Sequence, residues 1–186
     1  MHFMKKTRRS NHMAENKKVL CFISADFEDL ELWYPKLRLE ESGYTVHFAG
    51  EGKGVTYKGK YGIPAVSDVS WDDVDYPSYR GLLIPGGWAP DKLRRFSKVL
   101  EITKYMAENH KPIGQICHAG WVLASAEVLN DRKVTSTPGI KDDLRHAGAE
   151  WVNEPVVVDG NLVSGRWPKD LPYYTKAYID LLDAQG

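Results

Sequence analysis

The sequence predicts an α/β fold in which a parallel sheet is covered by helices on both faces. Short apolar runs, typical of strands buried on both faces, alternate with segments of helical periodicity along the 186-residue chain. Three of these runs are followed by segments that contain cysteine, histidine, glycine or acidic residues. Open α/β sheets bind ligands beyond the carboxyl ends of their strands. The length suits a single core, so we expect one domain over residues 17–184.

The individual elements follow from local patterns. Strands are expected in short, mostly apolar runs of four to seven residues at 18–24, 45–49, 81–84 and 112–116, and in a three-residue run at 133–135. Helices are expected where apolar residues recur at helical spacing, at residues 29–42, 96–109, 121–126, 140–147 and 173–182. A glycine-rich loop with a small hairpin is expected over residues 50–63. A second hairpin is expected where residues 156–159 and 162–163 flank Gly160-Asn161.

Cys117 and His118 lie at the break between strand 112–116 and the helical run that follows. A nucleophile at such a turn forms a nucleophile elbow, which holds the side chain out of the sheet. The unpaired N–H groups and the dipole of the following helix then favour a thiolate. The pattern predicts a reactive Cys117 with a lowered pKa, the alternative being a buried structural cysteine. Cys21 lies inside a predicted strand, so we expect it to be inert.

Two further strand ends carry candidate site residues. Glu28 either starts a helix or places its carboxyl beside Cys117, where burial and like charge would keep it protonated. Gly86 and Gly87 are either turn glycines or donors, with the N–H of His118, of an oxyanion hole facing Cys117. Trp88 and Trp121 follow these turns closely and are interpreted as walls of a substrate pocket. As a base, His118 needs a third group to orient it, and the local sequence supplies none.

Composition argues against several classes of protein. The formal net charge is zero, which argues against a nucleic-acid partner. Residues 1–16 form a basic N-terminal extension, either a binding arm or a leader outside the fold. No apolar run approaches the roughly 18 residues of a membrane span, and no secretory signal is evident. Two cysteines make no disulfide framework, and six histidines show no metal spacing. We therefore expect a cytoplasmic protein with no metal, no other cofactor and no membrane partner.

Several segments resemble the PfpI family of the ThiJ/PfpI superfamily. Residues 25–35 are similar to its Phe-Glu-Asp motif, residues 84–91 to its Pro-Gly-Gly-x-x-Pro-(Asp/Glu) motif, and residues 116–118 to its elbow. The match runs in order from about residue 18 to 182. The resemblance implies a flavodoxin-like three-layer sandwich with a mainly parallel sheet, and homo-oligomers built from dimers. It also implies that Cys117 is the nucleophile and His118 its partner, with Glu28 next to the thiol and Asp91 of a neighbouring subunit orienting the histidine.

Two departures from the family pattern bear on substrate choice. Ala119-Gly120 replaces the usual Gly-Pro after Cys-His, and Asp91 is one methylene shorter than the glutamate of some members. The resulting hypothesis is a cysteine-dependent hydrolase acting on carbonyl carbons, an intracellular peptidase or protein deglycase, with a peptide or small carbonyl substrate. The alternatives are a glyoxalase-type conversion of methylglyoxal, and a non-enzymatic redox stress sensor or chaperone that uses an oxidisable Cys117.

Overall fold

A computed structural model describes residues 17–185, and its centre is a seven-stranded sheet in the order β10-β11-β7-β6-β1-β2-β5. All neighbouring strands are parallel except β10 and β11, which form an antiparallel hairpin. The strands of this sheet are β1 (Lys18–Phe22), β2 (Thr45–Gly50), β5 (Val69–Ser70), β6 (Gly81–Ile84), β7 (Ile113–Ile116), β10 (Val156–Asp159) and β11 (Leu162–Gly165). The predicted mainly parallel sheet is confirmed.

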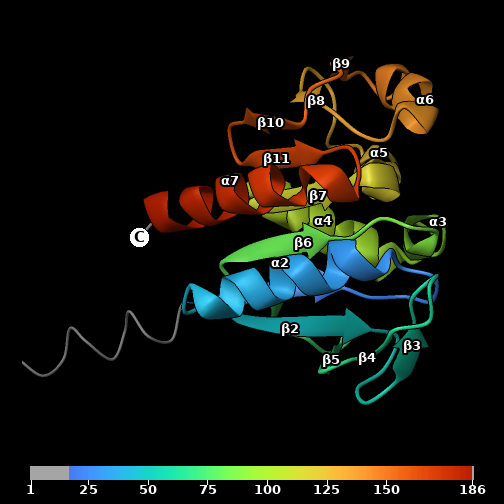
Figure 1. Cartoon of the computed structure of the whole chain (residues 1–186), viewed down its shortest axis with the longest axis vertical. Coiled ribbons are helices and arrows are strands. Elements are labelled where there is room, and N and C mark those ends of the chain that lie inside the picture. Colours follow the sequence, from blue (N-terminus) through green and yellow to red (C-terminus); the bar gives the residue numbers. More distant parts are fainter. Residues whose placement is uncertain (1–16, 186) are drawn as a thin grey trace, which may run out of the picture.

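Helices cover both faces of this sheet, as predicted (Figure 1). On one face α2 (Asp29–Glu41) and α7 (Leu171–Ala184) lie side by side, and on the other lie α4 (Ser97–Glu108) and α5 (Gly120–Ser125). Two short helices, α3 (Ala89–Leu93) and α6 (Lys141–His146), contact α5. Short 3-10 turns occur at Tyr76–Ser78, Cys117–Ala119, Pro138–Ile140 and Pro168–Asp170. The result is a three-layer α/β sandwich of the flavodoxin-like type.

Two small two-stranded sheets lie outside the main one. The strands β3 (Thr56–Lys58) and β4 (Pro64–Val66) form the expected hairpin, which extends three residues beyond the predicted end at residue 63. The predicted strand at 133–135 is present as β8 (Lys133–Val134), but it pairs with β9 (Glu150–Trp151) and not with the main sheet. Sequence reasoning missed α3, because five residues that include Pro90 show no helical period.

The strand order determines where the site lies. In the sheet β1, β6 and β7 are consecutive neighbours, and all of their residues except Lys18 are buried. Because these strands are parallel, the segments that follow them meet at one edge of the sheet. That edge brings together the three strand ends that the sequence marks as chemically unusual.

The basic extension at residues 1–16 lies outside the described residues. Among residues 17–185, no helix combines the length and the apolar character that crossing a bilayer requires.

Candidate active site

Cys117 lies on a strained elbow between β7 and α5. Its φ of 61° is in the left-handed region, whereas Ile116 before it is extended, with a φ of −139°. A left-handed residue other than glycine costs about 1–2 kcal/mol, so the surrounding contacts must hold the turn in place. Gly120 allows one of them: a Cβ there would lie 2.9 Å from both methyl carbons of Leu144, so α5 packs closely on α6. The Ala119-Gly120 pair therefore suits this helix contact.

The Cys117 sulfur has three polar neighbours at the elbow. His118 Nδ1 lies 3.3 Å from Sγ, so adjacent residues form the Cys-His pair within one chain. The backbone N–H groups of Gly87 and His118 face the sulfur and act to lower the pKa of the thiol. The N–H of Gly86 does not take part, because it donates to Glu31 Oε2 at 2.9 Å. Of the expected oxyanion donors, the structure thus brings Gly87 and His118 to the thiol and engages Gly86 elsewhere.

Gly87 allows the backbone of the loop after β6 to lie close to the backbone of the loop after β1. A Cβ on Gly87 would lie 2.4 Å from Asp26 O and 2.4 Å from Glu28 N, and the φ of Gly87 is +75°. The loop after β6 is bound to the loop after β1 by Glu28 N–H donating to Gly86 O at 3.1 Å and Trp88 N–H donating to Asp26 O at 2.8 Å. Only glycine permits this backbone pairing.

The carboxyl beside the thiol belongs to Glu31, and the expectation for Glu28 is wrong. Glu28 is the N-cap of α2, and its Oε2 accepts from Glu31 N–H at 2.9 Å. Glu31 lies further along the helix, and its carboxyl lies next to the thiol, because a Cβ on Gly86 would meet both Glu31 Oε2, at 2.3 Å, and Cys117 Cβ, at 2.6 Å. The reason is helical geometry, because Glu31 shares the buried face of α2 with Pro35 and Leu39 and so points into the sheet edge. A charged residue on an apolar helix face was the signal that could have identified it.

Burial controls the protonation of both groups. It raises the pKa of Glu31 to about 8, and the charge of Glu28 adds to this effect, so the Glu31 carboxyl is protonated at neutral pH. Burial, followed by the charge of Glu31, also raises the pKa of Cys117 to about 12, although the N–H groups of Gly87 and His118 oppose this. The expected lowering of the thiol pKa is therefore wrong for this chain. The elbow is desolvated more strongly than its short following helix can offset.

The His118 ring contacts two indole rings. Its ring centroid is 5.0 Å from that of Trp88 and 5.0 Å from that of Trp121. Burial, and then the positive charge of Lys60, lower the pKa of His118, so the imidazole is mostly neutral at pH 7 and can accept a proton. Trp88 is 54% exposed, whereas Trp121 is partly buried.

Asp91 makes an ion pair with Arg95, its Oδ2 accepting from Arg95 Nη2 at 2.6 Å. Within the described residues no hydrogen bond or ion pair joins Asp91 to His118. Asp91 lies on α3 and its side chain is 45% exposed, so it is available to a neighbouring molecule. Among residues 17–185, no carboxylate is hydrogen-bonded to the His118 ring, whose hydrogen-bond contact is the Cys117 sulfur.

Lys60, on the hairpin, is a second residue that sequence reasoning missed. Its charge lowers the pKa of both Glu31 and His118. The hairpin is held at the site by Asp29, whose carboxylate accepts from Tyr61 N–H and Ile63 N–H, both at 2.9 Å. No local sequence signal reveals this, because the contact joins residues 32 and 34 positions apart.

Cys21 is buried in β1, and burial raises the pKa of its thiol strongly. A fully buried thiol in a strand has little access to a reagent, and Cys117 is the more exposed of the two thiols. Among residues 17–185, no group of three or more His, Cys, Asp or Glu side chains is arranged to hold a metal ion.

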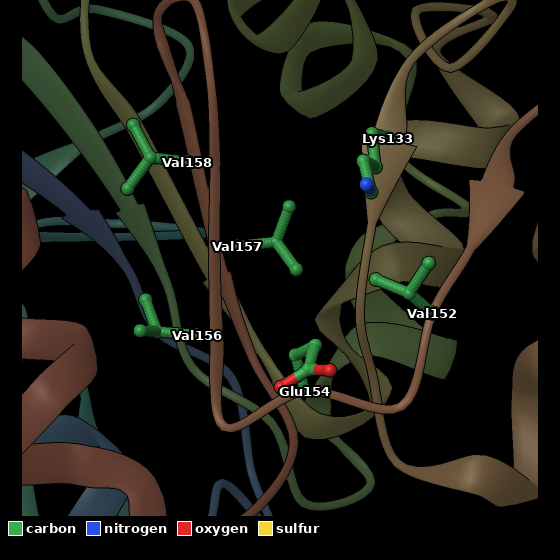
Figure 2. A pocket seen from close by; sticks show the side chains of 6 residues that line it. All are labelled: Lys133, Val152, Glu154, Val156, Val157 and Val158. Atoms are coloured by element: carbon green, nitrogen blue, oxygen red, sulfur yellow. The ribbon is translucent and has the colours of Figure 1, made fainter.

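A separate cavity of about 290 Å³ lies beside the edge strand β10. Figure 2 shows Val156, Val157 and Val158 along one side, with Lys133 and Val152 across from them and Glu154 at one end. Its lining shares no residue with the elbow.

The fold places the chain among α/β proteins that carry a cysteine on a strained turn between a strand and a helix, and comparisons with known proteins identify the family. Residues 17–181 match the model of the DJ-1/PfpI family, and the chain belongs to that family. Two archaeal relatives match over 165 residues, which is 89% of this chain and 99% of each relative. They are Deglycase PH1704 of Pyrococcus horikoshii, 44% identical, and Deglycase PfpI of Pyrococcus furiosus, 43% identical.

Solved structures agree on the fold. A two-domain protein from Anabaena variabilis with DJ-1/ThiJ/PfpI-like and ferritin-like domains superposes with a TM-score of 0.88 at 32% identity, over 90% of this chain and 48% of that one. Drosophila melanogaster DJ-1beta superposes with a TM-score of 0.83 at 25% identity, over 90% of this chain and 91% of that one.

Proposed function

We propose that this protein is a cysteine-dependent hydrolase of the PfpI type that acts on carbonyl carbons, and that protein deglycation is its leading activity. The observation that carries the proposal is the Cys117 Sγ–His118 Nδ1 pair at 3.3 Å, with backbone donors from Gly87 and His118 at the same sulfur. Deglycation is placed before peptide hydrolysis because the relatives that match over nearly their full length are named deglycases.

For an amide bond, as in a peptide substrate, the residues of the site support the following order of bond changes. His118 accepts the thiol proton as Sγ bonds to the carbonyl carbon, and the π electrons move to the carbonyl oxygen. That oxyanion faces the N–H groups of Gly87 and His118. When it collapses, the bond to the amine breaks and the imidazolium returns the proton to the leaving nitrogen. Water then hydrolyses the thioester and regenerates the thiol. With a methylglyoxal adduct, which is a hemiaminal, Sγ instead displaces the amine at the carbinol carbon. A proton then moves from that carbon to the neighbouring carbonyl carbon, which turns the hemithioacetal into a thioester that water hydrolyses in the same way.

Glu31 contributes as a neutral acid in this scheme. Below a pH of about 8 it is protonated, so it adds no negative charge next to a forming thiolate. A protonated carboxyl can also donate a hydrogen bond to that thiolate. Trp88 and Trp121 form the walls of the opening at His118, and Lys60 adds positive charge there.

The decisive test is the turnover of methylglyoxal-modified N-acetyllysine by wild type and by Cys117→Ser. We expect the variant to lose about 10³-fold or more in kcat, because a hydroxyl is a far weaker nucleophile than a thiol. Cys21→Ser is the matched control and should retain wild-type turnover. Equal turnover by Cys117→Ser and wild type would refute the cysteine mechanism.

The same assay separates deglycation from the glyoxalase alternative. The adduct concentration is held fixed while free methylglyoxal is varied with a scavenging amine. A rate that follows the adduct supports deglycation, and a rate that follows free methylglyoxal supports the glyoxalase reaction. The redox alternative predicts no turnover of either, with peroxide converting Cys117 to the sulfinate in intact protein.

Asp91 is proposed to act in trans, in a homo-oligomer built from dimers with a shared site. Its exposure and the absence of a carboxylate on His118 within the described chain support this role. Asp91→Asn should lower kcat about tenfold or more while leaving the fold intact, because its surface ion pair contributes under about 1 kcal/mol. Asp142→Asn, an exposed partner of Arg145, is the control and should be silent.

Mixing subunits tests the shared site directly. When Cys117→Ser and Asp91→Asn proteins are mixed and allowed to exchange, mixed dimers gain one complete site each. Activity should then rise to about a quarter of the wild-type value. No recovery after verified subunit exchange, or full activity in a strictly monomeric protein, would exclude the trans role.

A further inference from the structure

We infer that Trp88 and Trp121 are positioning residues for His118: the two indoles hold the imidazole between them, in the orientation that places Nδ1 beside the Cys117 sulfur. The centroid of each indole lies 5.0 Å from the centroid of the imidazole, with interplanar angles of 40° for Trp88 and 47° for Trp121. This role rests on the proposed function of Cys117 and His118 as a reacting pair.

Trp121 is the anchored wall. Its Nε1–H donates to Asp143 Oδ2 at 2.8 Å, which ties the first turn of α5 to α6. The Arg94 guanidinium lies 5.6 Å from the indole centroid and is itself held by Arg94 Nε donating to Ser125 Oγ at 2.8 Å. With three partners around one indole, including His118, the ring is held in a single orientation.

Trp88 is the outer wall. Its backbone is fixed by the N–H group that donates to Asp26 O at 2.8 Å, next to the bridge between Phe27 and Gly87. Its side chain is 54% exposed, and within the described residues its one aromatic neighbour is His118. An exposed indole that remains over an imidazole covers it from solvent on that side. The His118 ring therefore has a fixed wall and a solvent-facing wall.

The two indoles supply a restriction on the orientation of the His118 ring that no carboxylate of the described residues supplies. A histidine base needs a group that restricts its ring orientation, and a carboxylate usually does so by accepting from the second nitrogen. Two indoles achieve the same restriction sterically, since rotation of the imidazole would displace one of them. The restriction acts whether or not an acid from another subunit reaches His118.

The indoles also act electrostatically. Their faces carry negative potential and stabilise a cation, so they favour the imidazolium that forms when His118 takes the thiol proton. Lys60 opposes that charge, and Glu31 is neutral below a pH of about 8. Arg94 and Asp143 both contact Trp121, and Asp91 and Lys92 lie on the helix that begins after Trp88, each in an ion pair, with Arg95 and Asp26. Loss of an indole should therefore reduce thiolate formation at neutral pH.

The test uses Trp88→Leu and Trp121→Leu, which keep apolar bulk and remove the ring face. The rate of Cys117 alkylation by iodoacetamide is followed from pH 5 to 10. We expect a loss of about fivefold at pH 7 for each variant, with the pH profile displaced upward. Trp→Phe at either position should recover most of the rate, because a smaller aromatic face remains. Trp167→Leu, which removes an indole stacked on Arg166, is the control and should be silent.

Two independent readouts complete the test. The ¹⁵N shifts of the His118 ring should report a mixture of tautomers in the Leu variants, and kcat should fall more than KM rises. Unchanged alkylation profiles and ring shifts in both Leu variants would overturn the positioning role, as would a rise in KM alone. If Trp121→Leu fails to fold, the same measurements on Trp88→Leu decide the result, because Trp88 is exposed. Alkylation rates and ring shifts need no turnover. They can therefore support the positioning role of the two indoles even if the turnover of Cys117→Ser refutes the proposed hydrolase function.

Discussion

Replacing Gly86 by alanine is expected to abolish turnover and to lower the free energy of unfolding by about 3 kcal/mol. An added Cβ would lie 2.3 Å from Glu31 Oε2, 2.6 Å from the Cys117 Cβ and 3.0 Å from the Ile116 carbonyl oxygen. The last two atoms belong to the elbow itself and cannot move aside cheaply. The methyl would therefore push apart the carboxyl, the thiol and the strained turn together.

Urea unfolding and the adduct assay measure both effects in the same preparations. Gly139→Ala is the matched control, since a Cβ there meets nothing within 4 Å. The control should change stability by less than about 0.5 kcal/mol. A stable, active Gly86→Ala protein would show that the loop after β6 can move away from the elbow, which would contradict the packing described above.

Glu31→Gln should remove a large part of the pH dependence of stability. The folded pKa of Glu31 is about 8 against an ordinary value of 4.5, so the folded state keeps a proton that the unfolded state releases. Glu31 therefore contributes stability fully below about pH 4.5, and this contribution falls as the pH rises toward 8. At about 1.4 kcal/mol per pH unit the loss approaches 5 kcal/mol as an upper limit.

The measurement is the free energy of urea unfolding at pH 5 and pH 8.5. Glutamine is neutral at both pH values. The free energy of unfolding of the variant, relative to that of wild type, should therefore be a few kcal/mol higher at pH 8.5 than at pH 5. Glu41→Gln, on the exposed end of the same helix, should run parallel to wild type. Parallel curves for Glu31→Gln as well would mean that Glu31 is not protonated in the folded protein at neutral pH.

Much of the fold is predictable because local patterns specify it. Apolar runs of strand length and helical spacing locate β1, β6 and β7 and most helices within one to three residues. The failures have physical causes. The strand at 133–135 is correctly located, but its partner β9 depends on a connection of about fifteen residues. The short helix α3 depends on tertiary contacts with α5 and has no period of its own.

The candidate site divides in the same way. Cys117 and His118 are identifiable because a thiol and an imidazole at a strand-to-helix break have few structural reasons to be there. Glu28 was the wrong carboxyl because the choice between it and Glu31 depends on which face of α2 is buried. Sequence position alone favours the residue nearer the strand, whereas helical rotation places the next turn against the thiol.

The sequence by itself determined the alternating α/β order, the elbow and the cysteine that lies on it, since each is a local property of consecutive residues. Tertiary structure alone decided which carboxyl meets the thiol, which N–H groups face the sulfur, and that burial raises the thiol pKa rather than lowering it. The physical reason is that desolvation and contact depend on the distance between segments far apart in the chain. Any two of Glu31, Gly86 and Cys117 are more than thirty residues apart in the chain, and the hydrogen bond between Glu31 and Gly86 joins residues fifty-five positions apart. The three residues meet only when β1, β6 and β7 lie side by side.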